Sequence, residues 1–173
     1  MIELEGIKVY RKGRLILDLH FLQLNEGKAY ALIGENGSGK TTLLRLLAGV
    51  IQPSEGKIKG LYNLKVAYLP QKPYSFRMTV YQNLLLTSGA NQTLEQIQAV
   101  IKRVGLEGFE KQDARKLSGG EAQRMAIARL LLVPADLVLM DEPTAPVDLQ
   151  GREKIDKVIK EYVEANKASL VFA

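Results

Sequence analysis

The stretch GENGSGKT, residues 34–41, decides the fold of this chain, because it fits the pattern G-x-x-x-x-G-K-[ST]. The apolar residues 28–33 before it predict a strand, and residues 39–50 after it predict a helix. The glycines let the backbone turn its N–H groups towards phosphate oxygens, and the helix start adds a partial positive charge. A glycine-rich turn that fits the pattern by chance is the alternative, and the correct flanks on both sides argue against it.

The residues of this loop have separate expected roles. Lys40 is expected to reach the β- and γ-phosphates of a nucleotide, and the hydroxyl of Thr41 is placed to bind Mg²⁺. The residues expected to contact the nucleotide here are Gly34, Glu35, Asn36, Gly37, Ser38, Gly39, Lys40, Thr41 and Thr42.

The stretch LVLMDEP, residues 137–143, predicts an apolar strand that ends in two carboxylates. Asp141 comes at the carboxyl end of this strand, where open α/β sheets place their ligands, and is expected to hold Mg²⁺ from its outer coordination shell. Glu142 is then expected to orient and polarise the attacking water. An Asp-Glu pair that merely starts a turn is the alternative, and the presence of the phosphate loop argues against it.

The stretch LSGGEAQR, residues 117–124, predicts the start of a further helix. Ser118 is a good N-cap, and the two glycines after it leave backbone N–H groups of the helix open to an anion. The residues from Ser118 to Glu121 also form the S-x-x-E pattern of a capping box, so an ordinary capped helix is the alternative.

The order of the predicted elements indicates the fold class. Strands alternate with helices, which predicts an α/β fold with a mainly parallel sheet flanked by helices, an antiparallel portion at the N-terminus and a helical insert. Residues 1–71 and 117–173 are expected to form the nucleotide-binding core, and residues 72–116 are expected to form the insert. The alternative for the helix over 117–132 is that it belongs to the insert. The predicted strands are residues 2–10, 15–24, 28–33, 66–69, 137–140 and 168–173. The predicted helices are residues 39–50, 79–87, 93–104, 118–132 and 150–167. Residues 52–56 are predicted to form a turn.

Composition narrows the classes of protein. Hydrophobic residues make up 46% and charged residues 25% of the 173 residues, which is ordinary for a globular protein. The absence of cysteine excludes disulfides and cysteine metal sites. No apolar run approaches the ~18 residues that a membrane span needs. The net charge is +5, but the lysines and arginines are scattered, so a dedicated nucleic-acid surface is not expected.

In this order and spacing, GENGSGKT, LSGGEAQR and LVLMDEP resemble the nucleotide-binding domain of the ABC ATPases, and the resemblance covers nearly the whole chain. It implies binding of ATP and Mg²⁺ and a head-to-tail dimer of two such domains. Ser118 and Gly120 of one domain would contact the γ-phosphate held by Lys40 of the other, and Gly119 and Glu121 belong to the same expected contact. Lys40, Gln71 and Glu142 would form the catalytic group of this resemblance.

Three further residues are placed by the resemblance. Gln71 matches the glutamine that touches Mg²⁺ and the attacking water at the hinge to the insert. Tyr10 matches the aromatic residue that stacks on adenine, with packing on the core as its alternative. Asp148 matches an aspartate that communicates across the dimer. The sequence departs from the family there, because Ala-Pro-Val stands at 145–147 where Ser-Ala-Leu is usual, and Pro146 fixes its own φ and removes a donor.

The resemblance also implies a membrane partner. Transporter members press the helical insert against integral permease subunits, and the apolar Pro73, Tyr74, Phe76 and Met78 are candidates for that contact, with buried packing as the alternative. The leading expectation is an ATP-hydrolysing subunit of an importer of a small nutrient or inorganic ion, on the cytoplasmic face of the membrane. A soluble ABC ATPase acting on nucleic acid or the ribosome is the alternative, and a regulatory nucleotide binder is a third.

The last residues carry one more expectation. In the resembled family a histidine that contacts the γ-phosphate follows an apolar run like SLVFA, residues 169–173, and the chain has only His20, which is expected to be structural. We therefore expect the 173-residue chain to bind Mg-ATP and to hydrolyse it weakly, by analogy with losses of about 100- to 1000-fold when one transition-state contact is removed.

Overall fold

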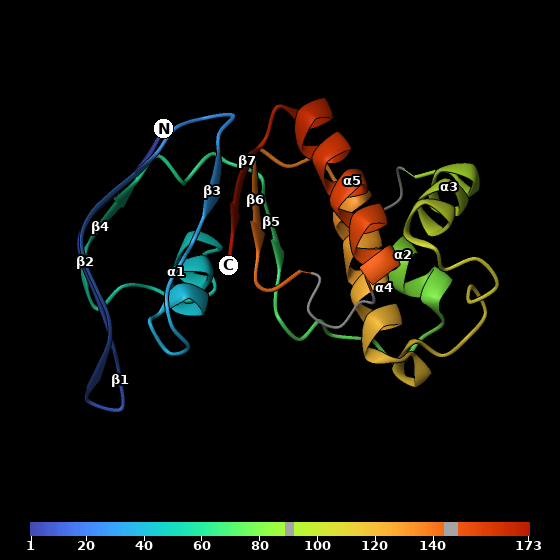
Figure 1. Ribbon diagram of the computed structural model, residues 1–173, viewed down its shortest axis with the longest axis horizontal. Helices are drawn as coiled ribbons and strands as arrows, with labels where there is room; N and C mark the ends of the chain where they lie inside the picture. Colours follow the sequence, from blue (N-terminus) through green and yellow to red (C-terminus); the bar gives the residue numbers. More distant parts are fainter. Residues whose placement is uncertain (89–91, 144–148) are drawn as a thin grey trace. The chain divides into compact units, whose positions relative to one another are not determined.

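The computed structural model describes residues 1–88, 92–143 and 149–173 (Figure 1). The chain forms two compact units. Residues 1–68, 135–141 and 166–173 form the first, and residues 69–134 and 142–165 form the second. This division places the helix that follows Ser118 with the helical part of the chain; the boundaries expected from the sequence stay a prediction.

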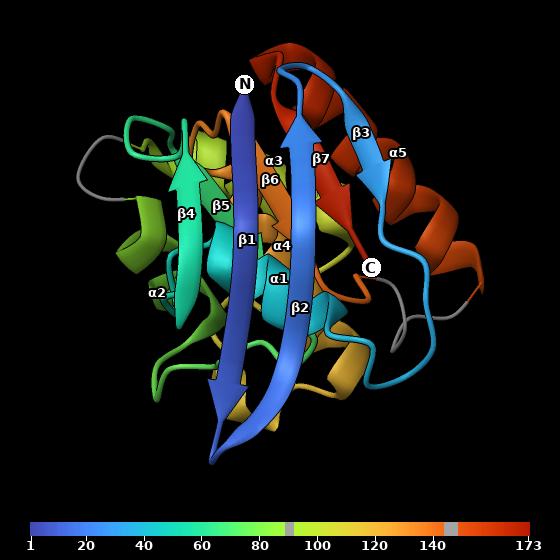
Figure 2. The same cartoon turned by 90° about the vertical axis from the view of Figure 1, so that its left-hand side faces the viewer.

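The first unit begins with an antiparallel sheet. Strand β1 (Ile2–Arg11) pairs with β2 (Arg14–Leu24) on one side and with β4 (Glu55–Lys59) on the other. Figure 2 shows this sheet face-on, with helix α1 (Lys40–Leu47) behind it. Alternate residues of β1 are buried because successive side chains of a strand point to opposite faces.

Strand β4 corrects the sequence-based prediction, which assigned residues 52–56 to a turn and left 57–59 without an element. The segment is rich in lysine and glycine, so its strand propensity is low, and its pairing with β1 provides the missing stabilisation. A Cβ on Gly56 would lie 2.5 Å from the carbonyl oxygen of Glu5, so only glycine permits this close approach. Ion pairs of β4 with β1, such as Lys59–Glu5 at 2.9 Å, are exposed and contribute less than about 1 kcal/mol each.

The second sheet of this unit has four strands in the order β3-β7-β6-β5. They are β3 (Ala29–Ala31), β5 (Val66–Leu69), β6 (Leu137–Met140) and β7 (Ser169–Phe172). Strand β7 pairs in parallel with both β3 and β6, so that Phe172 lies opposite Ala31 and Met140. The carboxyl ends of these three strands therefore meet at one edge of the sheet.

Helix α1 contributes to one hydrophobic core with both sheets. Its buried leucines belong to the same cluster as side chains of β1 and β6. Fully burying a leucine stabilises the fold by about 1.5–3 kcal/mol, so this core fixes the start of α1 relative to the strands. The core members that are completely buried include Leu4, Ile7, Leu44, Leu47, Leu137 and Leu139.

The second unit is helical. It contains α2 (Val80–Ser88), α3 (Leu94–Val104), the 3-10 helix η2 (Ala114–Lys116), α4 (Gly119–Leu131) and most of α5 (Leu149–Asn166). Helices α2, α3 and α4 pack against one another. Helix α3 begins with a capping box at Thr93 and ends at Gly105, whose φ is 71°. Such caps define helix ends because they satisfy backbone groups that have no partner within the helix.

The predicted fold class is confirmed: the protein is a mixed α/β structure with an antiparallel sheet, a parallel sheet and helices. Among the helices in the described parts of the chain, none combines the length and the apolar character that a membrane span requires.

Candidate nucleotide-binding site

The phosphate loop connects β3 to α1 in the first unit. Gly39 is the N-cap of α1, its φ is 94°, and no side chain caps the helix there. No acidic residue lies in the first turn of α1. The positive end of the helix dipole therefore faces the loop without a carboxylate in its first turn, as an anion site requires.

The Lys40 side chain folds back over this loop. Its ammonium group donates to the carbonyl oxygens of Gly34 at 2.7 Å and Glu35 at 3.0 Å. The N–H of Ser38 donates to the carbonyl of Glu35 at 3.2 Å, which closes the turn. Lys40 is thus held as a positive charge inside the turn formed by residues 34–39.

Two glycines of the loop have close neighbours. A Cβ on Gly34 would lie 2.7 Å from the hydroxyl oxygen of Ser38. A Cβ on Gly39 would lie 3.1 Å from the carbonyl oxygen of Ile16 in β2, at a φ that disfavours any other residue. The backbone conformation of Gly39 and its approach to β2 explain the glycine there, whereas the atom nearest to Gly34 is the end of a side chain that can rotate.

Tyr10 lies near the start of α1, at the end of β1. Its side chain is 43% exposed, so packing on the core does not account for it alone. It lines a cavity of about 360 Å³ together with Ile16 of β2 and Thr42 and Arg45 of α1. The cavity therefore has an exposed aromatic ring on one side and the first turns of the phosphate-loop helix on the other.

Asp141 follows the last residue of β6 at the edge where the strands β3, β6 and β7 end. It is 3% exposed, so it is one of the few buried acidic side chains among the described residues. Burial of a carboxylate is costly unless a charge or hydrogen bond compensates for it. The pKa of the neighbouring Tyr68 is raised. Burial is the main cause and the Asp141 carboxylate adds to it, whereas Arg45 acts in the opposite direction.

These residues fit ATP and Mg²⁺. Gly39 brings the backbone of the loop close to β2, the lysine of the loop and the helix start provide positive charge, and Asp141 provides a buried oxygen donor of the type that Mg²⁺ prefers. Lys40 and the N–H groups of the loop would hold the phosphates, and Thr41 and Asp141 would hold the metal.

Gln71 and Glu142, two further predicted site residues, belong to the second unit. Gln71 is exposed just after β5. Glu142 is half-buried, with a φ of 50° that is uncommon for a residue other than glycine. Asp148 lies outside the described residues. His20 is exposed on β2 in the first unit.

Ser118, Gly119, Gly120 and Glu121 form the start of α4. The hydroxyl of Ser118 accepts the N–H of Glu121, and the carboxylate of Glu121 accepts the N–H of Ser118 at 2.7 Å. The capping box expected as the alternative is therefore present. It places a carboxylate at the positive end of α4, in the stretch that the resemblance assigns to phosphate contact.

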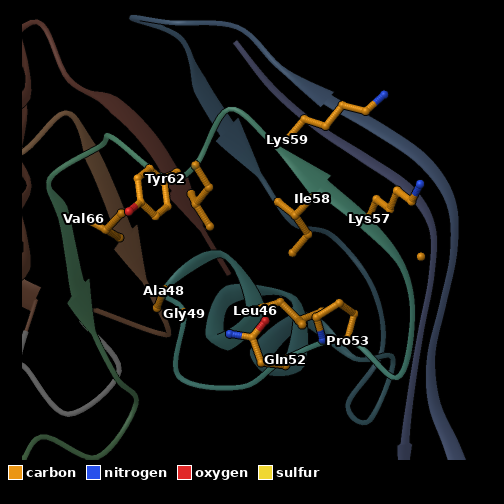
Figure 3. A pocket seen from close by; sticks show the side chains of 12 residues that line it. Leu46, Ala48, Gly49, Gln52, Pro53, Lys57, Ile58, Lys59, Tyr62 and Val66 are labelled. Carbon is orange, nitrogen blue, oxygen red and sulfur yellow. The ribbon is translucent and has the colours of Figure 1, made fainter.

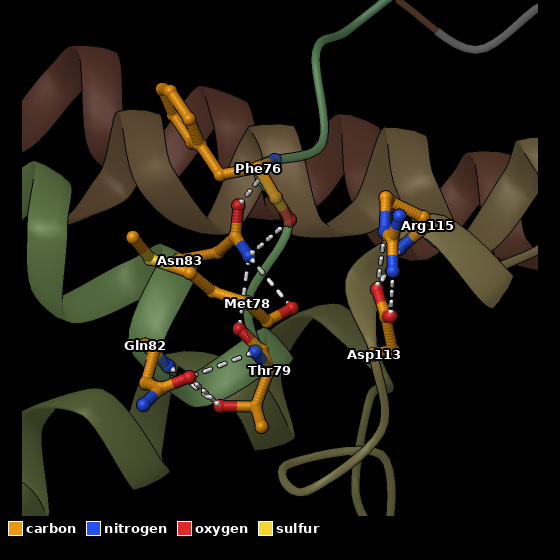
Figure 4. Close-up of polar contacts among 7 residues, drawn as sticks. All are labelled: Phe76, Met78, Thr79, Gln82, Asn83, Asp113 and Arg115. Atoms are coloured by element: carbon orange, nitrogen blue, oxygen red, sulfur yellow. Dashed lines mark hydrogen bonds and ion pairs between the residues drawn. The ribbon is translucent and has the colours of Figure 1, made fainter.

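An ion pair lies just before this helix start. Asp113 accepts from the backbone N–H and the guanidinium of Arg115, with a closest distance of 2.6 Å (Figure 4). The Arg115 guanidinium and its backbone N–H lower the pKa of Asp113 to about 2. The pair fixes η2 immediately ahead of the Ser118 cap.

The apolar segment after Gln71 is exposed. Tyr74, Phe76 and Met78 are 69%, 38% and 41% exposed, so buried packing does not explain their side chains, and Pro73 is half-buried. The rings of Tyr74 and Phe76 meet edge to face, with centroids 5.0 Å apart.

Sequence reasoning missed the residue that holds this segment. Asn83 of α2 is fully buried; it accepts the N–H of Phe76 and donates to the carbonyls of Phe76, Met78 and Thr79 (Figure 4). Arg129 of α4 donates to Asn83 and to the carbonyl of Tyr74. The partners of Asn83 in residues 76–79 lie within seven residues of it, whereas only the fold brings Arg129, 46 residues later, to the same side chain.

A cavity of about 620 Å³, larger than the one beside Tyr10, lies elsewhere in the first unit (Figure 3). It is lined by the end of α1, by β4 and by Tyr62 and Val66, and no predicted site residue lines it. Figure 3 shows Ile58 pointing into this space, while the ammonium groups of Lys57 and Lys59 point away from it.

Comparison with known proteins agrees with this arrangement. Residues 17–145 match the family described as ABC transporter. Over 154 residues the chain is 35% identical to the zinc import ATP-binding protein ZnuC of Vibrio vulnificus (strain YJ016), which covers 88% of this chain and 59% of that protein. The chain therefore spans less than two thirds of the length of this relative.

Solved structures give the same result. One match is a chain in the crystal structure of the complex of archaeal ribosomal stalk protein aP1 and archaeal ribosome recycling factor aABCE1. The identity is 32% and the TM-score is 0.83, over 98% of this chain and 33% of that one. A putative ABC transporter ATP-binding protein from Pyrococcus furiosus has a TM-score of 0.84 at 23% identity, over 99% of this chain and 90% of that one. At this lower identity the likeness concerns the fold alone.

Proposed function

The chain belongs to the ABC transporter family and carries the ATPase domain of that family, and from this premise we propose that the protein is the ATP-hydrolysing subunit of a membrane transporter. One observation carries the proposal. A complete phosphate loop, with Lys40 held inside it, lies at the same edge of the parallel sheet as the buried Asp141.

In this proposal each residue of the site has one task. Lys40 and the N–H groups at the start of α1 bind the β- and γ-phosphates, and Tyr10 contacts the base. Mg²⁺, when bound by Thr41 and Asp141, neutralises charge on the phosphates. Glu142 and Gln71 orient the attacking water, and Glu142 accepts its proton.

The proposal includes a head-to-tail dimer. The phosphate loop belongs to the first compact unit and the start of α4 to the second, and in the proposed dimer a second copy supplies the loop that the start of α4 contacts. Ser118, Gly119 and Gly120 then contact the γ-phosphate held by the other subunit, and Asp148 communicates across the dimer. Such an arrangement is two-fold symmetric, with two equivalent ATP sites.

The transported substrate is proposed to be a small nutrient or inorganic ion, imported through permease subunits, with this protein on the cytoplasmic face of the membrane. The similarity to a zinc import ATP-binding protein supports a divalent metal ion as the cargo. The exposed side chains of Tyr74, Phe76 and Met78 support a partner at that segment, since exposed apolar groups of this kind mark interaction surfaces.

Calorimetric titration with Mg-ATP tests the binding step. Lys40→Ala should abolish measurable binding, whereas Lys57→Ala should leave it unchanged, because Lys57 is an exposed residue of β4 outside the site. Equal affinity of the wild type and Lys40→Ala would contradict the proposal.

For the transport role, deletion of the gene should lower cellular uptake of a divalent metal, and Lys40→Ala should fail to restore it.

A soluble ATPase acting on the ribosome is the second candidate. The 32% identity to a chain in the structure of the archaeal ribosome recycling factor complex favours it. Sedimentation through sucrose gradients separates the two candidates. ATP-dependent association of the full-length protein with ribosomal subunits would support the second, and co-purification with membrane permease subunits would support the first.

A further inference from the structure

Gln123 connects the helix that begins at Ser118 to the turn that follows Glu142. Its side chain is fully buried on α4, and its Nε2 donates to the carbonyl oxygen of Pro143 at 2.9 Å. Helix α4 and residues 142–143 belong to the same compact unit. A single side-chain amide thus joins two segments that the proposed function uses.

The direction of this hydrogen bond is fixed by chemistry. The Pro143 carbonyl can only accept, so the amide nitrogen of Gln123 and not its oxygen faces it. Proline has no N–H, and therefore its carbonyl is the only backbone group of Pro143 that can be held by a hydrogen bond. Gln123 donates its hydrogen bond to that carbonyl.

Packing alone does not explain a glutamine at this position. Its Oε1 is buried and has no hydrogen-bond partner among the described residues. A buried acceptor without a partner lowers stability, so an apolar side chain of the same length would suit a purely structural role better. The half-satisfied amide therefore points to a task for its nitrogen.

The backbone of the neighbouring Glu142 indicates what that task is. Its φ of 50° lies in the left-handed region, which a residue other than glycine keeps only where its surroundings hold it. We propose that Gln123 is a positioning residue that holds the backbone at Glu142, and so the direction of its carboxylate, through the carbonyl of Pro143. This inference rests on the proposed role of Glu142 in ATP hydrolysis.

The inference has a mechanical consequence. Ser118 and Gln123 belong to one end of the same helix, so a shift of α4 moves the hydrogen bond to Pro143 as well. Contact of Ser118 with the phosphate of a partner subunit would then be transmitted to Glu142 through one amide group.

Gln123→Met in the full-length protein tests the inference, because methionine keeps the length and removes the donor. The expected kcat for ATP hydrolysis falls about 10- to 100-fold, the scale of a misplaced catalytic group, with ATP affinity unchanged. In a Glu142→Gln background the same substitution should cause no further loss. An unchanged kcat, or an equal loss in both backgrounds, would overturn the inference.

A second measurement is independent of turnover. Hydrogen–deuterium exchange of peptides covering residues 137–143 should accelerate in Gln123→Met and not in Ile127→Val, a control that removes one buried methylene from the same helix. Equal exchange in the wild type and Gln123→Met would refute the positioning role. If Glu142→Gln retains full turnover, the proposed function of Glu142 fails, and the exchange measurement still decides whether Gln123 holds this turn.

Discussion

The guanidinium carbon of Arg129 lies 5.3 Å from the centre of the Phe76 ring, and the same guanidinium donates to the carbonyl of Tyr74 and to the side chain of Asn83. Partial burial lowers the pKa of Arg129. The contact ties the last turn of α4 to the exposed aromatic segment that we propose as the partner surface.

Arg129→Met should therefore loosen this segment. Hydrogen bonds to a charged group contribute about 1.5–3 kcal/mol, so the free energy of unfolding should fall by about that amount, as measured by urea denaturation. Arg103→Met is the matched control, because the Arg103–Glu161 pair is exposed and contributes less than about 1 kcal/mol. Similar losses in the two variants would contradict the role of Arg129.

Gly39→Ala should weaken ATP binding by about tenfold or more, because a left-handed φ costs about 1–2 kcal/mol for an alanine and the new Cβ presses on the carbonyl of Ile16. Titration with Mg-ATP measures the effect. Gly108→Ala controls for strain alone, since Gly108 has a φ of 87° with open space around it in the second unit. Its affinity for ATP should equal that of the wild type.

Glu121→Gln should strengthen the proposed ATP-dependent dimer. A glutamine can still accept the N–H of Ser118, while the negative charge beside the expected γ-phosphate disappears. Repulsion between two unit charges about 4 Å apart in water is about 1 kcal/mol and falls with distance, which predicts a gain of up to about fivefold per site in analytical ultracentrifugation with ATP. Glu95→Gln, in the first turn of α3, should have no such effect. Weaker association of Glu121→Gln would contradict this expectation.

The Asp113–Arg115 pair should make stability depend on pH in the acid range. The pKa of Asp113 is about 2 in the folded protein against 3.8 ordinarily. A lowered carboxyl pKa stabilises the fold above the unfolded value, and this contribution is lost as the pH falls from about 4 to 2. Asp113→Asn should therefore have a lower Tm at pH 7 and a smaller decline in Tm below pH 4. An identical acid profile of the two proteins would exclude this contribution.

Much of the fold could be predicted from the sequence, because local patterns determine it. The apolar run before Asp141 gave the observed bounds of β6, and the capping box at Ser118 was read directly from its spacing. Strand β4 was missed because its stability comes from pairing with a strand some fifty residues earlier, which no local pattern reveals.

The site divides in the same way. The phosphate loop is one contiguous stretch, so its residues could be predicted together. Gln123 could not, although it lies within the quoted LSGGEAQR stretch, because it acts on a carbonyl twenty residues later in the chain. The carbonyl partners of Asn83 lie only four to seven residues before it, but no sequence pattern marks an asparagine that bonds to them. Buried amides of this kind become recognisable only when their partners are known.

The contact between Gly39 and the carbonyl of Ile16 has a consequence for nucleotide selection. It joins the hairpin that carries Tyr10 to the first residue before the phosphate-loop helix, within one compact unit. We therefore expect the span from the proposed base position at Tyr10 to the phosphate loop to vary little, so that a ligand must have the right length to reach both. A nucleoside or an inorganic triphosphate can satisfy one end, and the protein gains its full affinity only from a molecule that spans the two.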